Sequence, residues 1–159
     1  MSARPSKATE KPRAVLDTNV VLAAHRTRNP RSPNAELLRR WRAGEFVQLY
    51  SDDTLAELAE KFQEQGIDPA SAAEHLADLV RLGEYVTVTP ADVEPVVAAD
   101  PDDDLVLACA VKGQATHLVT YDPHLQALGK AYRDVEILDG LHFLYVVRGD
   151  QPPPAEKKE

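Results

Sequence analysis

The sequence predicts an α/β fold, specifically a three-layer α/β/α sandwich around a central, mainly parallel sheet. Short apolar segments rich in Val, Leu and Ile alternate along the chain with longer segments whose apolar residues recur at helical spacing. Strands separated by helices in this way are typical of a parallel sheet with helices on both faces. The length of 159 residues, 43% of them hydrophobic, is sufficient for one domain with a substantial core.

The predicted strands are short apolar runs, and the predicted helices are bounded by cap residues. Asp68 is a candidate N-cap with Pro69 in the first turn, and Gly66 and Gly83 each follow the last residue of a helical pattern. Residues 141–147 form a short apolar element that fits either a strand or a helix. We expect strands at residues 13–18, 46–51, 84–90, 116–122 and 135–140, and helices at residues 32–45, 52–66, 68–83 and 102–113.

Both ends of the chain have the composition of polar tails. Residues 1–12 are mostly polar and contain two prolines, and residues 149–159 contain three consecutive prolines. Neither segment can bury enough apolar surface to offset the entropy of ordering it. We therefore expect one folded domain at residues 13–148 between two disordered tails.

The composition favours a cytoplasmic protein with no membrane partner. No apolar run approaches the roughly 20 residues of a membrane-spanning helix, and the N-terminus lacks the apolar core of a secretory signal. The single cysteine, Cys109, rules out a framework of internal disulfides. The formal net charge of −8 argues against a broad basic surface that binds nucleic acid by neutralising phosphates alone. A nucleic-acid enzyme stays open, because bound cations can be the largest local charges in a site.

Two aspartates stand where apolar strands end. Asp17 follows the run "AVL", and Asp122 follows "HLVTY". Ligands of α/β sheets bind outside the carboxyl ends of the strands, so both carboxylates are expected at the same edge. Two further acidic candidates are Asp104, which opens a buried helix after "DPDD", and Glu57, which lies off the apolar stripe of its helix.

Four carboxylates at one edge would repel one another, and this repulsion would raise their pKa values and cost stability. A hard divalent cation relieves it, because Mg²⁺ and Mn²⁺ prefer oxygen ligands. Such ions can activate a water molecule, orient it for in-line attack and stabilise the leaving oxygen of a phosphodiester. The sequence therefore suggests Asp17, Glu57, Asp104 and Asp122 as a catalytic Mg²⁺ or Mn²⁺ site.

Each of these residues also has a purely structural alternative. Asp17 could cap the turn after its strand, and Asp122 before Pro123 resembles an ordinary turn. Glu57 could pair with Lys61 at i, i+4 on a solvated helix face. The aspartates after Pro101 could serve only as cap and first-turn residues that suit the helix dipole.

Other candidate residues are weaker. The segment "HRTRNPR" contains Arg26, Arg28 and Arg31, whose guanidinium groups suit phosphates, and a solvated basic loop explains the segment equally well. Histidines show no zinc-type spacing, and Cys109 fits a buried core position. The five histidines are His25, His75, His117, His124 and His142.

The motifs "VLDTNVV", "LAEL" and "DPDDDLVLACAVKGQATHLVTYDPHL" together resemble those of PIN domains, and most closely the toxin components of toxin–antitoxin systems. The resemblance covers roughly residues 13–147. Its most specific part is D-P-x-D-D, an apolar helix, a glycine and an apolar strand that ends in T-x-D. The tyrosine before Asp122 departs from the glycine often found there, and this departure removes no carboxylate.

The resemblance implies a metal-dependent endoribonuclease with a compact α/β sandwich. It places the four acidic positions at Asp17, Glu57, Asp104 and Asp122, with Asp103 as the alternative to Asp104 and Asn19 as a polar neighbour of Asp17. It further implies an RNA substrate and a cognate antitoxin protein as partner. Asn19 and the three arginines of the basic segment are the weaker RNA-binding candidates. Toxins of this family commonly dimerise, so a homodimer is also expected.

Two other functions remain compatible with the residues. A phosphoacceptor or phosphatase would use Asp17 as a nucleophile, but that class needs a second aspartate where Asn19 stands. A non-catalytic PIN-like module for RNA or protein binding would keep the fold alone. The presence of all four acidic positions argues against that second alternative.

Overall fold

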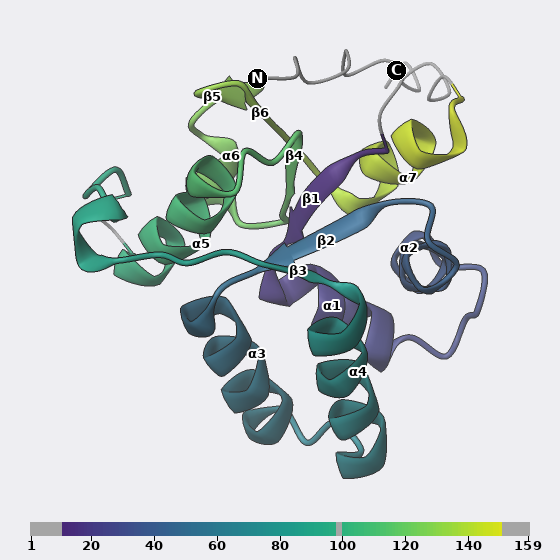
Figure 1. Cartoon of the computed structure of the whole chain (residues 1–159). Helices are drawn as coiled ribbons and strands as arrows, with labels where there is room; N and C mark the ends of the chain where they lie inside the picture. Colours follow the sequence, from purple (N-terminus) through teal and green to yellow (C-terminus); the bar gives the residue numbers. More distant parts are fainter. Residues whose placement is uncertain (1–10, 98–99, 151–159) are drawn as a thin grey trace, which may run out of the picture.

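The structure, a computed structural model, describes residues 11–97 and 100–150. A six-stranded sheet with the order β3-β2-β1-β4-β6-β5 forms its centre (Figure 1). All neighbouring strands pair in parallel except β5, which pairs antiparallel with β6. The strands are β1 (Arg13–Leu16), β2 (Val47–Tyr50), β3 (Glu84–Tyr85), β4 (His117–Val119), β5 (Ala131–Tyr132) and β6 (Val135–Leu138).

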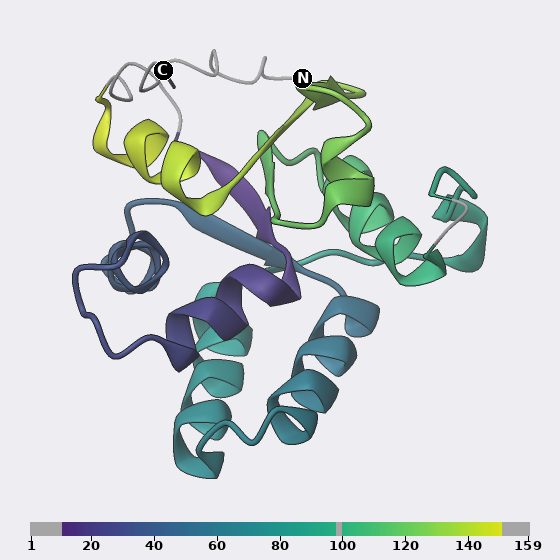
Figure 2. The ribbon, with the colours of Figure 1, turned by 180° about the vertical axis from the view of Figure 1, so that it is seen from behind.

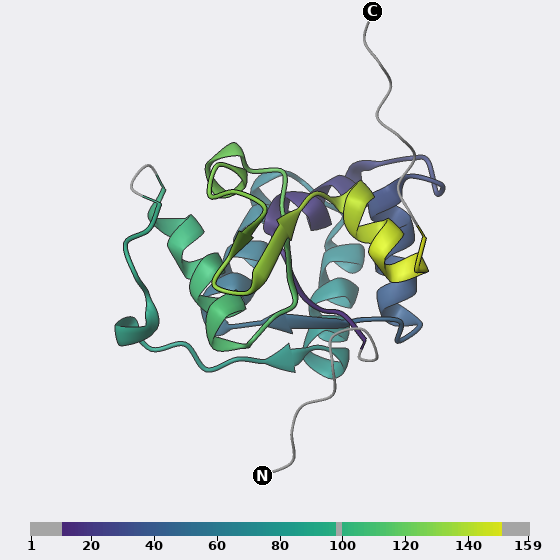
Figure 3. The same cartoon turned by 90° about the horizontal axis from the view of Figure 1, so that it is seen from above.

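Helices cover both faces of the sheet. One face is covered by α1 (Thr18–Arg26), α2 (Pro33–Arg42), α3 (Asp52–Glu64), α4 (Pro69–Leu82) and α7 (Gly140–Arg148). The other face carries α5 (Pro101–Lys112) and the short α6 (Pro123–Gln126), and a 3₁₀ turn η1 (Pro90–Asp92) precedes α5. Seen from above, α5 lies on the opposite side from α2 and α7 (Figure 3).

The alternation of strand side chains divides the core into two layers. Ala14 and Leu16 of β1 pack with the α1, α2 and α7 side, whereas Val15 packs with the α5 side. The same alternation separates Val119 from Leu118 in β4. Because side chains in a strand point to opposite faces in turn, a strand buried on both faces is apolar at every position.

The structure confirms the predicted α/β fold class, and several of its elements differ from the expected ones. Residues 84–90 were expected as a strand, but only Glu84–Tyr85 pair in the sheet. Residues 141–147, left open, lie in helix α7, where Asp139 caps the first turn. Residues after Asp17 form helix α1, and α6 and β5 are two additional short elements.

The ends of the described chain bear on two further expectations. The predicted tails fall mainly on residues 1–10 and 151–159, which lie outside the described residues. Within residues 11–97 and 100–150, no helix has the length and apolar character needed to cross a membrane.

Both outermost strands of the sheet, β3 and β5, are only two residues long.

Candidate metal centre at the carboxyl edge of the sheet

The carboxyl ends of β1 and β4 bring the first and last acidic candidates together. These strands are parallel neighbours, with Leu16 opposite Val119. Asp17 follows β1 and is the N-cap of α1, which leaves the end of β1 at this edge (Figure 2). Asp122 follows β4 and is the N-cap of α6. The capping roles considered from the sequence are therefore present, and they fix both carboxylates at one edge.

Thr120 connects these two aspartates through a single hydroxyl group. Its Oγ1 donates a hydrogen bond of 2.7 Å to Oδ2 of Asp17 and accepts one of 2.9 Å from the backbone N–H of Asp122. The other oxygen of Asp17, Oδ1, accepts the backbone N–H of Thr18 at 2.9 Å. Because Thr120 is fully buried, this arrangement holds the Asp17 carboxylate in one orientation.

The environment of Asp17 disfavours its charge. Burial raises the pKa of Asp17, and the hydrogen bond from Thr120 opposes this shift. The negative charges of Asp122 and Asp100 raise the pKa of Asp17 further. Asp17 is thus buried near two other carboxylates without a positively charged partner among the described residues.

Asp103, on the first turn of α5, points toward the same edge. It is 5% exposed, and its Oδ2 has no hydrogen-bond partner within the described part of the chain. Burial, with smaller contributions from the negative charges of Asp122, Asp100 and Asp17, raises the pKa of Asp103 to about 8. A buried carboxylate oxygen without a partner is costly, and a bound cation would relieve that cost.

Asp104, the third acidic ligand favoured from the sequence, has a different role in the structure. Its Oδ1 accepts the backbone N–H groups of Val96 and Val97, at 3.0 and 2.7 Å. These bonds direct Asp104 to the segment before α5. The geometry therefore favours the sequence alternative, Asp103, as the third acidic position.

Glu57 on α3 interacts electrostatically with the carboxylates of this edge. Burial, together with the negative charges of Asp17 and Asp102, raises the pKa of Glu57 to about 7. Lys61 on the next turn lowers the pKa of Glu57, but its ammonium group forms an ion pair with Glu64 at 3.1 Å instead of the i, i+4 pair with Glu57 considered from the sequence. The half-buried Glu57 is thus electrostatically coupled to Asp17.

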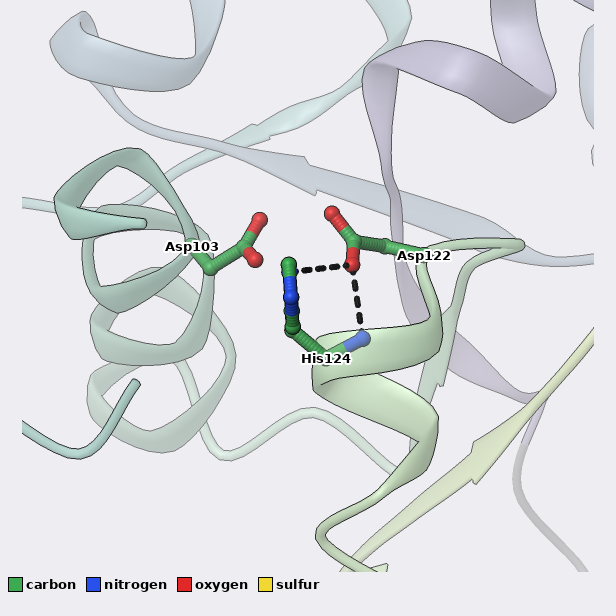
Figure 4. Close-up of side chains that lie close together, drawn as sticks. All are labelled: Asp103, Asp122 and His124. Carbon is green, nitrogen blue, oxygen red and sulfur yellow. Dashed lines mark hydrogen bonds and ion pairs between the residues drawn. The ribbon is translucent and has the colours of Figure 1, made fainter. Parts of the chain in front are cut away.

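A compact group of three possible ligands lies between α5 and α6. One ligand atom from each of Asp103, Asp122 and His124 can be chosen so that all three lie within 4.8 Å of one another. Nδ1 of His124 lies 3.4 Å from Oδ1 of Asp122, and that oxygen also accepts the backbone N–H of His124 at 2.8 Å. Figure 4 shows Asp103 on α5 facing the other two side chains across the gap between these helices.

The residues at this edge fit a divalent cation. The carboxylates of this edge repel one another. The pKa values of Asp17, Glu57 and Asp103 are raised, and the charge of Asp122 contributes to the increase for Asp17 and Asp103. Carboxylate oxygens are the donors that Mg²⁺ and Mn²⁺ prefer. The unpartnered Oδ2 of Asp103 supplies a free donor atom in a buried position.

The weaker RNA-binding candidates lie elsewhere or have structural partners. Oδ1 of Asn19 accepts the backbone N–H of Tyr121 at 3.3 Å, so Asn19 supports the turn after β4. Arg26 ends α1 and hydrogen-bonds Gln65 of the α3–α4 connection, and Arg28 and Arg31 are exposed beyond it. At 1.5 Å per helical residue, Arg26 is about 13 Å along α1 from Asp17. The arginines therefore lie at the opposite end of α1 from the acidic edge, which is the sheet edge where Asp17, Asp103 and Asp122 lie.

The arrangement of motifs on this fold has a counterpart among known families. The sequence profile of the PIN domain matches residues 13–124, which include all the acidic residues described above. The chain belongs to the PIN domain family. None of the curated protein sequences is significantly similar to this PIN domain.

Two solved structures share the fold of this PIN domain. PAE2754 from Pyrobaculum aerophilum has a TM-score of 0.59 and 15% sequence identity, and the match covers 94% of this chain and 100% of that one. The toxin VapC20 from Mycobacterium tuberculosis, which cleaves the sarcin–ricin loop, has a TM-score of 0.53 and 17% identity, with 77% and 98% of the chains covered. At this level of identity the two structures show the fold alone.

Two contributors to the site are not evident from the sequence. His124 had no recognisable zinc-type spacing, and only its position two residues after a strand-end aspartate could have pointed to it. Thr120 appeared as part of a motif, but its contact with Asp17 joins residues 103 positions apart. A pairing over that distance becomes visible only when β1 and β4 lie side by side.

Proposed function

We propose that this PIN domain is a divalent-metal-dependent endoribonuclease that hydrolyses RNA phosphodiesters. Asp17, Glu57, Asp103 and Asp122 are the proposed catalytic and metal-holding carboxylates. The observation that carries the proposal is the unpartnered, buried Oδ2 of Asp103, which faces Asp122 at the edge where Asp17 also lies. Such an array of like charges is costly unless a cation is shared between them.

Different residues would position the carboxylates of such a site and hold the cation. Thr120 orients Asp17, and capping of α6 orients Asp122, so both carboxylates are positioned before any ligand binds. Glu57 comes from a different helix, α3, and interacts electrostatically with Asp17. Mg²⁺ or Mn²⁺, when bound, would supply charge stabilisation at the phosphodiester and activate the attacking water. The expected products carry 5′-phosphate and 3′-hydroxyl ends.

We also propose that the protein is the toxin of a toxin–antitoxin pair and acts in the cytoplasm. Membership of the PIN family and the fold shared with the toxin VapC20 support this role. RNA is then the substrate, with the exposed Arg28 and Arg31 as candidate phosphate contacts beyond the acidic edge. A cognate antitoxin protein would be the partner, and a homodimer is the proposed assembly.

The test is cleavage of a 5′-labelled single-stranded RNA by the full chain in Mn²⁺, in Mg²⁺ and in EDTA. Asp17→Asn and Asp103→Asn should each lower the cleavage rate at least 100-fold, because each removes a charge that holds the cation. Glu94→Gln is the matched control, because it neutralises an exposed carboxylate that pairs with Arg133 away from this edge. Circular dichroism checks that every variant remains folded.

Two results would contradict the nuclease proposal. Full cleavage in EDTA would exclude metal dependence. Tight RNA binding without cleavage in either metal, unchanged in Asp103→Asn, would favour the non-catalytic RNA-binding module instead.

A further inference from the structure

We propose that His124 is a protein ligand of the cation beside Asp103 and Asp122. The site then has one nitrogen and two carboxylate donors, and it selects first-row transition ions such as Mn²⁺ and Co²⁺ over Mg²⁺. This inference rests on the metal centre of the proposed function and adds a ligand and a metal preference to it. The acidic positions named from the sequence do not include this histidine.

The distances allow the three side chains to share one ion. Ligand atoms about 2.1 Å from a metal lie at most about 4.2 Å apart. One atom from each of Asp103, Asp122 and His124 lies within 4.8 Å of the others, so small side-chain rotations close the set. Nδ1 of His124 and Oδ1 of Asp122, at 3.4 Å, already satisfy this limit.

The backbone fixes how His124 is presented. Asp122 is the N-cap of α6 and accepts the backbone N–H of His124 at 2.8 Å. This bond fixes the backbone of His124 beside Asp122, at the start of the short helix. The imidazole then extends from α6 toward Asp103 on α5 (Figure 4).

The buried oxygen of Asp103 is an independent sign that a ligand belongs here. Asp103 is 95% buried, and its Oδ2 has no hydrogen-bond partner in the described part of the chain. Asp122 and His124, by contrast, are partly exposed, with side-chain exposures of 19% and 53%. The site is therefore closed on the α5 side and open to solvent on the α6 side, which gives an ion from solution a path of entry.

The donor set determines the preferred ion. Mg²⁺ favours oxygen ligands and retains several waters, so an imidazole adds little to its binding. Imidazole nitrogen binds later first-row ions more strongly, and affinity rises from Mn²⁺ toward Co²⁺ and beyond. Replacing one oxygen donor by His124 therefore shifts the preference away from Mg²⁺.

A second aspartate–histidine pair, Asp139 and His142, resembles Asp122 and His124 but has no third ligand among the described residues. His142 stands near the start of α7 as His124 does near the start of α6, and the N-cap Asp139 accepts its backbone N–H at 2.9 Å. Nδ1 of His142 lies 2.7 Å from Oδ1 of Asp139, and its side-chain exposure of 56% is nearly that of His124. Among the described residues, the only group of three possible ligands is that of Asp103, Asp122 and His124.

The experiment measures metal binding without turnover. The full chain is freed of metal, and its affinities for Mn²⁺, Co²⁺ and Mg²⁺ are determined by calorimetry, with His124→Ala and His142→Ala alongside. His124→Ala should weaken Mn²⁺ and Co²⁺ binding at least tenfold and change Mg²⁺ binding less than twofold. Pulsed electron paramagnetic resonance of the Mn²⁺ complex should show nitrogen coupling in the wild type and in His142→Ala, and none in His124→Ala.

The outcomes separate this inference from the proposed function. Unchanged Mn²⁺ and Co²⁺ affinities in His124→Ala, or no nitrogen coupling in the wild type, would overturn the role of His124. If Asp103→Asn nonetheless abolishes Mn²⁺ binding, the carboxylate centre and the nuclease proposal stand without it. Failure of the wild-type chain to bind any of the three ions would remove both.

Discussion

The Asp103 side chain illustrates how a single residue can be kept in an unfavourable state. It is buried, one of its oxygens has no partner among the described residues, and its pKa is raised to about 8. An acid with a raised pKa in the folded state binds its proton more tightly there than in the unfolded chain. Between pH 4 and 8, stability therefore falls as the pH rises, because the unfolded state releases its proton first.

This sign gives a prediction for the metal-free protein. Asp103→Asn should raise the free energy of unfolding in EDTA at pH 8 by about 1 kcal/mol or more, because it removes a charge that burial disfavours. At pH 5 the difference should shrink, since the wild-type carboxyl group is then protonated. Urea denaturation in EDTA at the two pH values measures both quantities.

The exposed neighbour Asp102 provides the control. Asp102→Asn should change stability by less than about 0.5 kcal/mol at either pH. A metal-free Asp103→Asn that is less stable than the wild type at pH 8 would contradict the electrostatic argument. Adding Mn²⁺ should stabilise the wild type and not Asp103→Asn, because only the wild type retains the ligand.

Of the acidic positions, those at strand ends can be predicted from the sequence, whereas the choice between neighbouring aspartates on a helix cannot. Asp17 and Asp122 could be placed because each follows a strand, and parallel strands deliver their ends to one edge. Asp103 and Asp104 both stand in the first turn of α5, and consecutive helical residues point about 100° apart. Spacing along the chain cannot decide which of the two faces the edge, because that depends on how α5 rotates against the sheet.

The start of helix α5 combines structural and candidate functional carboxylates. Asp100 is the N-cap and accepts the backbone N–H of Asp102 at 3.0 Å. Asp104 holds the segment before the helix through the backbone N–H groups of Val96 and Val97. The first turn of α5 and its N-cap therefore contain one carboxylate that caps the helix, one that holds the preceding segment and one, Asp103, that faces the acidic edge.

Loss of the Asp104 carboxylate should therefore affect stability directly. Asp104→Ala leaves the backbone N–H groups of Val96 and Val97 without this acceptor. Hydrogen bonds to a charged group contribute about 1.5–3 kcal/mol to the free energy of unfolding. We expect the free energy of unfolding to fall by about 2–3 kcal/mol in urea denaturation with EDTA present. Asp102→Ala, in the same turn, should lower it by less than about 0.5 kcal/mol. Equal effects of the two substitutions would show that Asp104 does not anchor this segment.

At the scale of elements, the long helices were predictable and the short elements were not. The helices at 32–45, 52–66, 68–83 and 102–113 carry apolar periodicity between cap residues, and all four are present. The segment 84–90 has the composition of a strand, but it pairs over only two residues before η1. Strand pairing depends on neighbouring strands and not on local propensity alone.

The whole molecule is held on one face by a buried aromatic and histidine cluster between α1, α2, α3 and α4. Nδ1 of His75 lies 3.2 Å from Nε2 of His25, and the ring of His75 is fully buried. Trp41 and Phe62 pack against it, with ring centroids 5.4 and 5.6 Å away. Burial is the largest cause that lowers the pKa of His75, to about 3, and it also lowers the pKa of His25.

This cluster should make the fold sensitive to acid. A histidine whose folded pKa lies below its unfolded value of 6.5 stabilises the fold at neutral pH, and this contribution is lost as the pH falls from 6.5 toward 3. The loss amounts to at most about 1.4 kcal/mol per pH unit for one histidine. The neighbouring His25 and Arg42 also lower the pKa of His75 and Asp78 raises it, and each of these effects is smaller than that of burial.

The measurement compares the wild type with His75→Leu in urea denaturation at pH 7, 6, 5 and 4. The carboxylates of the acidic edge have the opposite pH dependence and are present in both proteins, so the difference between the two proteins reports on His75 and its contact with His25. The advantage of the wild type over His75→Leu should decrease, or its disadvantage should grow, as the pH falls below 6.5. A difference that does not vary with pH would show that His75 takes up no proton on unfolding.

The outer limits of the sheet constrain how this molecule can meet other proteins. With β3 and β5 each contributing only two residues, neither margin offers a long row of free backbone groups to which an added strand could pair. Continuation of the sheet into a second copy, or into an inhibitor's extended segment, is therefore disfavoured. Associations of this protein should instead use side chains presented by its helices, and they can form and separate without exposing the central strands.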